Sequence, residues 1–81
     1  MIKLKSERVR GEDMRLVLQV EQEVDGRWLA EIAELPGVMA YGQTPNEARA
    51  KAQALALRVI ADRLEHGEES PDLQNITFAA A

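Results

Sequence analysis

The stretch LPGVMAYGQTPNEARAKA, residues 35–52, constrains the fold most because it specifies a turn, a strand and a helix start in succession. Leu35-Pro36-Gly37 predicts a tight turn, since proline cannot donate to a strand ladder and glycine readily adopts a positive φ. Residues 38–42, VMAYG, predict a short strand. Thr44-Pro45-Asn46-Glu47 is typical of a helix start: it offers a threonine cap, a proline at the first helical position and a glutamate that closes a capping box.

Two runs of alternating apolar and polar residues precede this junction. Residues 15–23 read RLVLQVEQE, and residues 27–34 read RWLAEIAE. A period of two predicts half-buried strands, and Asp25-Gly26 between the runs favours a turn. The two runs therefore predict a β-hairpin.

The length of the hairpin loop sets which side chains share a face. A two-residue loop would place the apolar side chains of the second run beside the polar ones of the first. A three-residue loop, Val24-Asp25-Gly26 with Gly26 left-handed, shifts the pairing by one residue. It places Ala30 beside Val20 and Ile32 beside Leu18, so we predict this loop.

A long helix is predicted from Pro45 to His66, with Gly67 as its left-handed cap. At about 100° per residue, two apolar stripes run along it. The first is expected to cover the sheet and contains Ala48, Ala52, Leu55, Ala56, Val59 and Ile60.

The second stripe lies roughly opposite the first. A helix that packs on one sheet needs only one apolar stripe, so the second has no expected partner within the domain. We predict that it contacts another subunit, because a small core gains much from extra burial, although alanine also simply favours helix. The stripe contains Ala50, Ala54, Leu57, Ala61 and Leu64.

The remaining segments complete the predicted fold. Ile76 and Phe78 suggest a short closing strand, residues 2–5 could form a further edge strand, and residues 8–13 look like a polar link. The predicted class is α+β: an antiparallel three-stranded meander followed by one long helix and a short closing strand, in the order β-β-β-α-β.

Composition narrows the functional classes. A chain of 81 residues with 46% apolar residues predicts one folded domain. It has no cysteine and no apolar segment typical of a signal peptide, so a cytoplasmic protein is expected. The net charge of −4 opposes binding to a phosphate backbone and suits a basic partner better.

No motif predicts catalysis, and we expect no cofactor and no metal. His66 stands at the carboxyl end of the predicted helix, where its imidazole can interact favourably with the helix dipole. The carboxylates are scattered over solvated faces. The glycines fit turns and caps and form no phosphate-binding loop. Trp28, Met39 and Tyr41 are more informative, because these residue types are enriched in protein interfaces. Trp28 is expected to bury its ring, whereas Met39 and Tyr41 could lie on either face of the sheet.

The segment DGRWLAEIAELPGVMAYGQTPNEARAKA resembles the signature of the HicB-like antitoxin family. Its elements are a turn glycine, an aromatic strand start, Leu-Pro-Gly, Gly-x-Thr and a Glu-Ala helix opening. The resemblance covers about residues 14–71 and implies a truncated ribonuclease H-like or double-stranded-RNA-binding-domain-like fold. We assign residues 14–81 to this domain and residues 1–13 to an N-terminal extension. Longer family members carry a DNA-binding module; we expect none here, and so no direct DNA binding.

The resemblance implies a protein that binds a small basic HicA-type toxin and blocks its mRNA-cleaving site. A homo-oligomer, dimer or tetramer, and no membrane association are expected. An orphan self-assembling structural or regulatory module is the alternative, and nucleic-acid binding is a third reading that the charge disfavours. The predicted partner-binding residues are Trp28, Glu31, Glu34, Met39 and Tyr41.

Overall fold

The computed structural model describes residues 13–67 and 75–81. Its elements are β1 (Asp13–Gln22), β2 (Trp28–Ile32), β3 (Met39–Gly42), α1 (Pro45–Glu65) and β4 (Asn75–Ala80). The expected order β-β-β-α-β is confirmed. The extra edge strand predicted at residues 2–5 lies outside the described residues, and β1 begins two residues before its predicted start.

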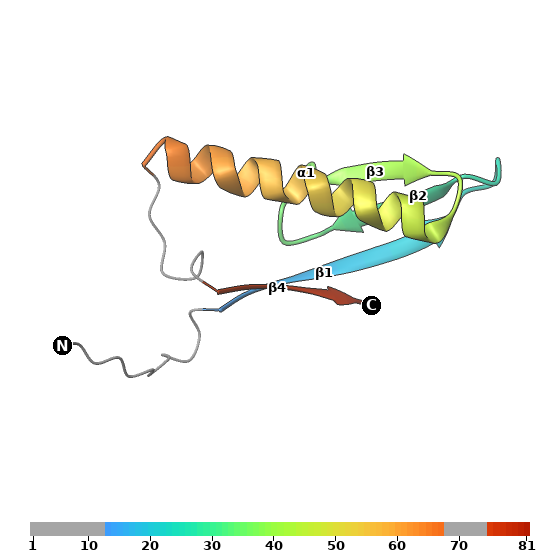
Figure 1. Ribbon diagram of the computed structural model, residues 1–81. Coiled ribbons are helices and arrows are strands. Elements are labelled where there is room, and N and C mark those ends of the chain that lie inside the picture. Colours follow the sequence, from blue (N-terminus) through green and yellow to red (C-terminus); the bar gives the residue numbers. More distant parts are fainter. Residues whose placement is uncertain (1–12, 68–74) are drawn as a thin grey trace.

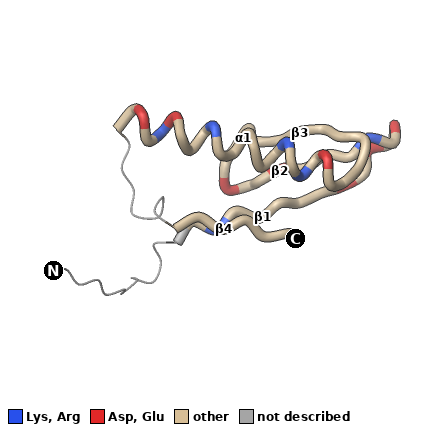
Figure 2. The backbone as a smooth tube through the Cα atoms, in the orientation of Figure 1, with Lys and Arg blue, Asp and Glu red and all other residues tan. Residues whose placement is uncertain are grey.

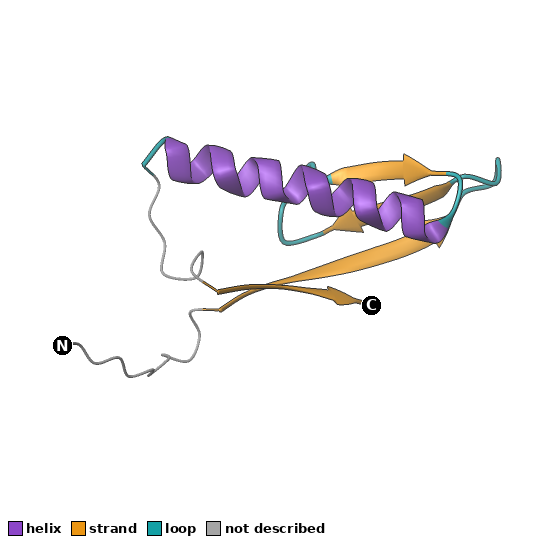
Figure 3. Cartoon of the chain, viewed as in Figure 1, coloured by secondary structure: helices purple, strands orange, loops and turns teal. Residues whose placement is uncertain are grey.

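The sheet has four strands in the order β3-β2-β1-β4, with α1 on one of its faces (Figures 1 and 3). Strands β1, β2 and β3 form the predicted antiparallel meander. The closing strand makes the sheet mixed, because β4 pairs with β1 in parallel. Two reversals make β3 parallel to β1, and α1 then returns the chain across the sheet, so β4 enters in that same direction. The expectation of a meander plus a closing strand did not include this parallel pair.

The hairpin register confirms the three-residue loop. Val20 lies opposite Ala30, and Leu18 lies opposite Ile32. The loop closes with two backbone hydrogen bonds, from Glu23 N–H to the Arg27 carbonyl at 2.7 Å and from Gly26 N–H to the Glu23 carbonyl at 2.9 Å. Gly26 has φ +93°, so the left-handed position predicted for it is present.

The second reversal uses the Leu-Pro-Gly turn. Val38 N–H donates to the Leu35 carbonyl at 3.0 Å, and Gly37 between them has φ +91°. Ile32 N–H then donates to the Val38 carbonyl at 3.1 Å, which starts the pairing of β2 with β3. This short turn brings β3 back alongside β2 and delivers the chain to the helix start.

The core lies between α1 and the inner face of the sheet. The helix packs against β3, β2 and β1, in decreasing order, and has almost no contact with β4. Small residues dominate its buried stripe, which allows the helix to approach the strands closely; Leu55 and Val59 are only half-buried. Within the described residues, no helix is long and apolar enough to cross a membrane. The buried residues are Leu16, Leu18, Ala30, Ile32, Leu35, Val38, Ala48, Ala52, Ala56 and Ile60.

The start of α1 matches most of the predicted capping box. The Thr44 hydroxyl accepts from Glu47 N–H at 3.0 Å, and Pro45 stands at the first helical position. The reciprocal bond differs from the expectation, because the Glu47 carboxylate accepts from the N–H of Gln43, one residue before the cap. The cap therefore also fixes the strand-to-helix connection.

Replacing Glu47 with glutamine should lower the melting temperature at neutral pH and change it little in acid. The Gln43 N–H and then the Lys51 ammonium, 3.5 Å away, hold the pKa of Glu47 below its ordinary value of 4.5. A carboxyl with a lowered folded-state pKa contributes stability above its unfolded pKa and loses it as pH falls through the folded-state pKa. Thermal unfolding between about pH 7 and about pH 3 tests this pH dependence. Glu21→Gln is the control, because Glu21 has no hydrogen-bond partner among the described residues; an equal, pH-independent effect of both changes would contradict the prediction.

Candidate binding face of the sheet

One face of the sheet is left uncovered by α1 (Figure 1). Cross-strand pairing arranges the side chains of this face in rows. Glu21, Leu29 and Tyr41 form one row, because Glu21 lies opposite Leu29 and Leu29 opposite Tyr41. The adjacent row on the same face consists of Gln19, Glu31 and Met39, because Gln19 lies opposite Glu31 and Glu31 opposite Met39. We call the two rows together the outer face; it consists of Gln19, Glu21, Leu29, Glu31, Met39 and Tyr41.

The outer face has an apolar centre at its β3 side. Met39 is 46% exposed and Tyr41 39% exposed, and Leu29 is half-buried beside Tyr41. Scattered exposed apolar residues are ordinary, but these three come from two neighbouring strands and lie within two adjacent rows. Large, partly exposed tyrosine and methionine side chains are characteristic of the cores of protein interfaces.

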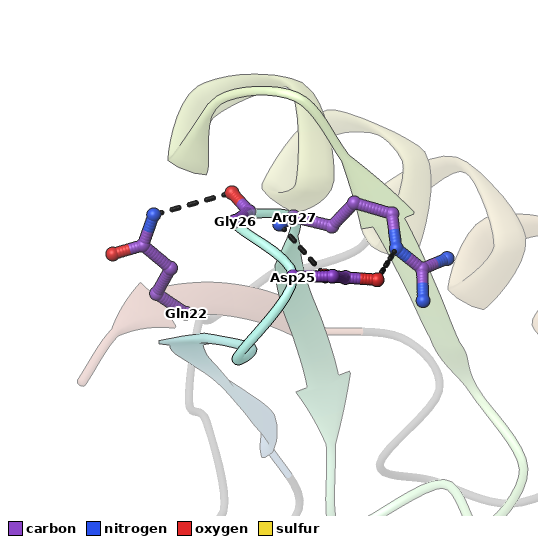
Figure 4. A network of polar contacts seen from close by, with 4 residues as sticks. All are labelled: Gln22, Asp25, Gly26 and Arg27. Carbon is purple, nitrogen blue, oxygen red and sulfur yellow. Dashed lines mark hydrogen bonds and ion pairs between the residues drawn. The ribbon is translucent and has the colours of Figure 1, made fainter.

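A polar network that includes Asp25 and Arg27 lies at the hairpin tip, at one end of the outer face (Figure 4). The Arg27 guanidinium lies over the Tyr41 ring, 4.0 Å from its centroid. The same side chain donates from Nε to Asp25 Oδ2 at 2.8 Å, and Arg27 N–H donates to Asp25 Oδ1 at 3.0 Å. The backbone N–H and then the guanidinium of Arg27 lower the pKa of Asp25. Arg27 is thus held on Tyr41 with its charge offset by Asp25.

The charge of the outer face itself is negative. Glu21 and Glu31 stand in its two rows. In the part of the chain that the structure describes, neither forms an ion pair. Two acids therefore border the apolar centre, and they would attract a basic surface; the cation of Arg27, which also lies at this centre, is paired with Asp25.

Three of the five predicted partner-binding residues, Glu31, Met39 and Tyr41, come together on the outer face. Trp28 does not join them, because it lies opposite Gly42 on the helix side of β2, half-buried against the core. Glu34 lies in the turn after β2, where its carboxylate accepts from Val17 N–H at 3.2 Å.

Sequence reasoning missed three members of the outer face, Gln19, Glu21 and Leu29, and also Arg27 beside it. Leu29 has the strand parity of Glu31, two residues away, so alternation would have found it. Arg27 stacks on Tyr41 across two strands, and only the pairing register reveals that contact.

The second apolar stripe of α1 faces solvent. Its members Ala50, Ala54, Leu57, Ala61 and Leu64 are all exposed, Leu57 by 48% and Leu64 by 52%. Their contact with another subunit stays a prediction.

The single histidine of the sequence lies at the end of α1. His66 caps α1, with Nδ1 2.8 Å from the Asp62 carbonyl oxygen and 3.3 Å from Asp62 Oδ1. Over residues 13–67 and 75–81, no three histidine, aspartate or glutamate side chains group as metal ligands.

Comparisons with protein-family models, with curated proteins and with solved structures found no match to this chain.

Proposed function

We propose that this chain is a HicB-type antitoxin, a binding protein that neutralises a HicA-type mRNA-cleaving toxin through its outer face. The observation that carries the proposal is the pair of exposed side chains, Met39 and Tyr41, beside Leu29 on a sheet face that α1 leaves uncovered. A face of this kind fits a protein partner.

The mechanism is steric occlusion. Glu21 and Glu31 accelerate the encounter with a basic protein, whereas Met39 and Tyr41 supply the apolar anchors that slow dissociation. Arg27 keeps the Tyr41 ring in one place before binding, which reduces the entropy lost in the complex. The resemblance implies that the bound antitoxin covers the toxin's catalytic histidine and its RNA surface.

The residues that carry the resemblance support the proposal through the fold. Gly26 and Gly37 form the two positive-φ turns, and Gly42 lies against the first turn of α1. Thr44 and Glu47 form the helix start. Each of these residues has a structural task, so we propose that the shared motif specifies a truncated ribonuclease H-like framework that presents the outer face.

Tyr41→Ala should weaken inhibition of a HicA-type toxin by about 30-fold, because loss of an interface hot spot costs about 2 kcal/mol or more. The measurement is the antitoxin concentration that halves RNA cleavage by the purified toxin. Leu57→Ala is the matched control, since it removes another exposed apolar side chain, from the side of α1 away from the sheet. Thermal unfolding checks that both variants fold.

Equal inhibition by both variants would place the contact surface elsewhere. If the native chain neither binds the toxin nor stops cleavage, the antitoxin proposal fails and the orphan self-assembling module replaces it.

A further inference from the structure

Strand β4 ends the sheet next to β1, and its other edge pairs with no described strand. Its sequence, NITFAA, contains no charged residue and no proline (Figure 2). Soluble proteins ordinarily protect an open edge with charge, proline or a bulge, since unpaired backbone groups invite another strand. The opposite edge, β3, has only four residues. Of the two edge strands, β4 is therefore the longer, and it carries neither charge nor proline to protect it.

The helix side of β4 is apolar and largely uncovered. Ile76 lies opposite Met14, and Phe78 lies opposite Leu16. Leu16 is fully buried, but Ile76 and Phe78 remain half-buried because α1 has almost no contact with β4. A further strand carrying apolar residues on this side would extend the core over the edge.

The backbone direction of β4 fixes which residues can bond a new strand. Ala81 N–H donates to the Leu18 carbonyl at 3.0 Å. Backbone groups alternate in direction along a strand, so the N–H and carbonyl groups of Ala79 and Thr77 also point toward β1. The N–H and carbonyl groups of Ile76, Phe78 and Ala80 consequently point to the open edge. An antiparallel strand must pair with these residues and keep its apolar side chains on the helix side.

A second copy of β4 meets both conditions. Centred on Thr77, antiparallel pairing places Ile76 opposite the partner's Phe78 as a hydrogen-bonded pair. It places the two Thr77 residues opposite one another as a non-hydrogen-bonded pair. Aromatic–β-branched and Thr–Thr pairs are both favourable across strands.

We propose that two copies of this chain pair through β4, antiparallel about a twofold axis at Thr77, into one continuous sheet. Both helices then lie on the same side of that sheet, and both outer faces lie on the other. The proposal does not depend on the toxin or on the exposed stripe of α1.

A cysteine at Thr77 tests the pairing, because the chain has no other cysteine. Facing residues of a non-hydrogen-bonded pair have Cα atoms about 4.5 Å apart, within the range of about 4.4–6.8 Å for disulfides. Under mild oxidation, most Thr77→Cys chains should become covalent dimers. Asn75→Cys is the control on the same strand, since it faces Ala79 of the partner and should remain a free thiol. Light scattering of the native full chain should give twice the 9.0 kDa chain mass.

A charge at the twofold axis gives an independent readout. Thr77→Lys places two lysines opposite each other and should return the mass to 9.0 kDa, whereas Gln19→Lys, on the same sheet face but beyond the end of β4, should leave the dimer intact. A native chain that is monomeric overturns the proposal, as does a dimer in which both cysteine variants link equally. An intramolecular disulfide in a Leu4→Cys/Thr77→Cys double variant also overturns it, because residues 2–5 would then occupy the edge.

Discussion

Replacing Gly42 with alanine should destabilise the domain by about 3 kcal/mol, the upper end of the usual cost of overpacking. A Cβ built at this position would lie 2.6 Å from the Ala48 nitrogen and 3.0 Å from both the Ala48 Cα and the Glu47 carbonyl carbon. These are backbone atoms of the first turn of α1, so no side chain can move aside. A domain of this length is expected to have a free energy of unfolding of about 4–12 kcal/mol, so the loss is a large part of it. Urea unfolding monitored by Trp28 fluorescence measures the change.

Gly26→Ala is the comparison for this variant. A Cβ at Gly26 meets nothing within 4 Å, but φ is +93°, so the cost is backbone strain of about 1 kcal/mol. Gly42→Ala should therefore be clearly the less stable of the two variants. The reverse order would mean that α1 can shift away from β3 at little cost.

Ala52→Leu should destabilise the domain by about 3 kcal/mol, whereas Ala54→Leu should change stability by no more than about 0.5 kcal/mol. Ala52 is 0% exposed between α1 and the sheet, and Ala54 is exposed two residues further along the same helix. Both substitutions add the same atoms and change helix propensity by nearly the same amount. The difference between their free energies of unfolding therefore measures how much space lies between α1 and the sheet.

Denaturant unfolding of both variants at the same concentration measures this difference. A large loss of stability for Ala54→Leu would show that the second apolar stripe of α1 is covered in solution. An equal small effect for both would show that the contact between α1 and the sheet adapts to added volume.

Much of the fold was predictable because its signals are local. The hairpin register follows from the alternation around Asp25-Gly26, and Thr44 with Pro45 marks the helix start. The parallel placement of β4 was not predicted, although two hairpin reversals already make β3 parallel to β1. Its edge position depends on where α1 returns the chain, which is a tertiary property.

The candidate site was only partly predictable. Residue type points to Met39 and Tyr41, and alternation places them on one face of their strand, but alternation cannot say which face of the sheet α1 covers. Residue type also points to Trp28, although its position, three residues before Glu31, gives it the opposite strand parity. Strand parity therefore separates them: Trp28 lies on the helix side of β2, half-buried against the core, whereas Met39 and Tyr41 lie on the outer face.

The parallel pairing of β1 with β4 also has a kinetic consequence. The hairpin and the Leu-Pro-Gly turn join neighbouring segments, whereas Asp13 and Asn75 are roughly 60 positions apart in the chain. Contacts between distant segments form slowly, because a long loop must close before they contribute free energy. The meander and α1 are therefore expected to assemble first and β4 to dock last. During that interval β1 is itself an open edge, and Leu16 lacks its neighbour Phe78, so refolding at high concentration should favour aggregation through β1.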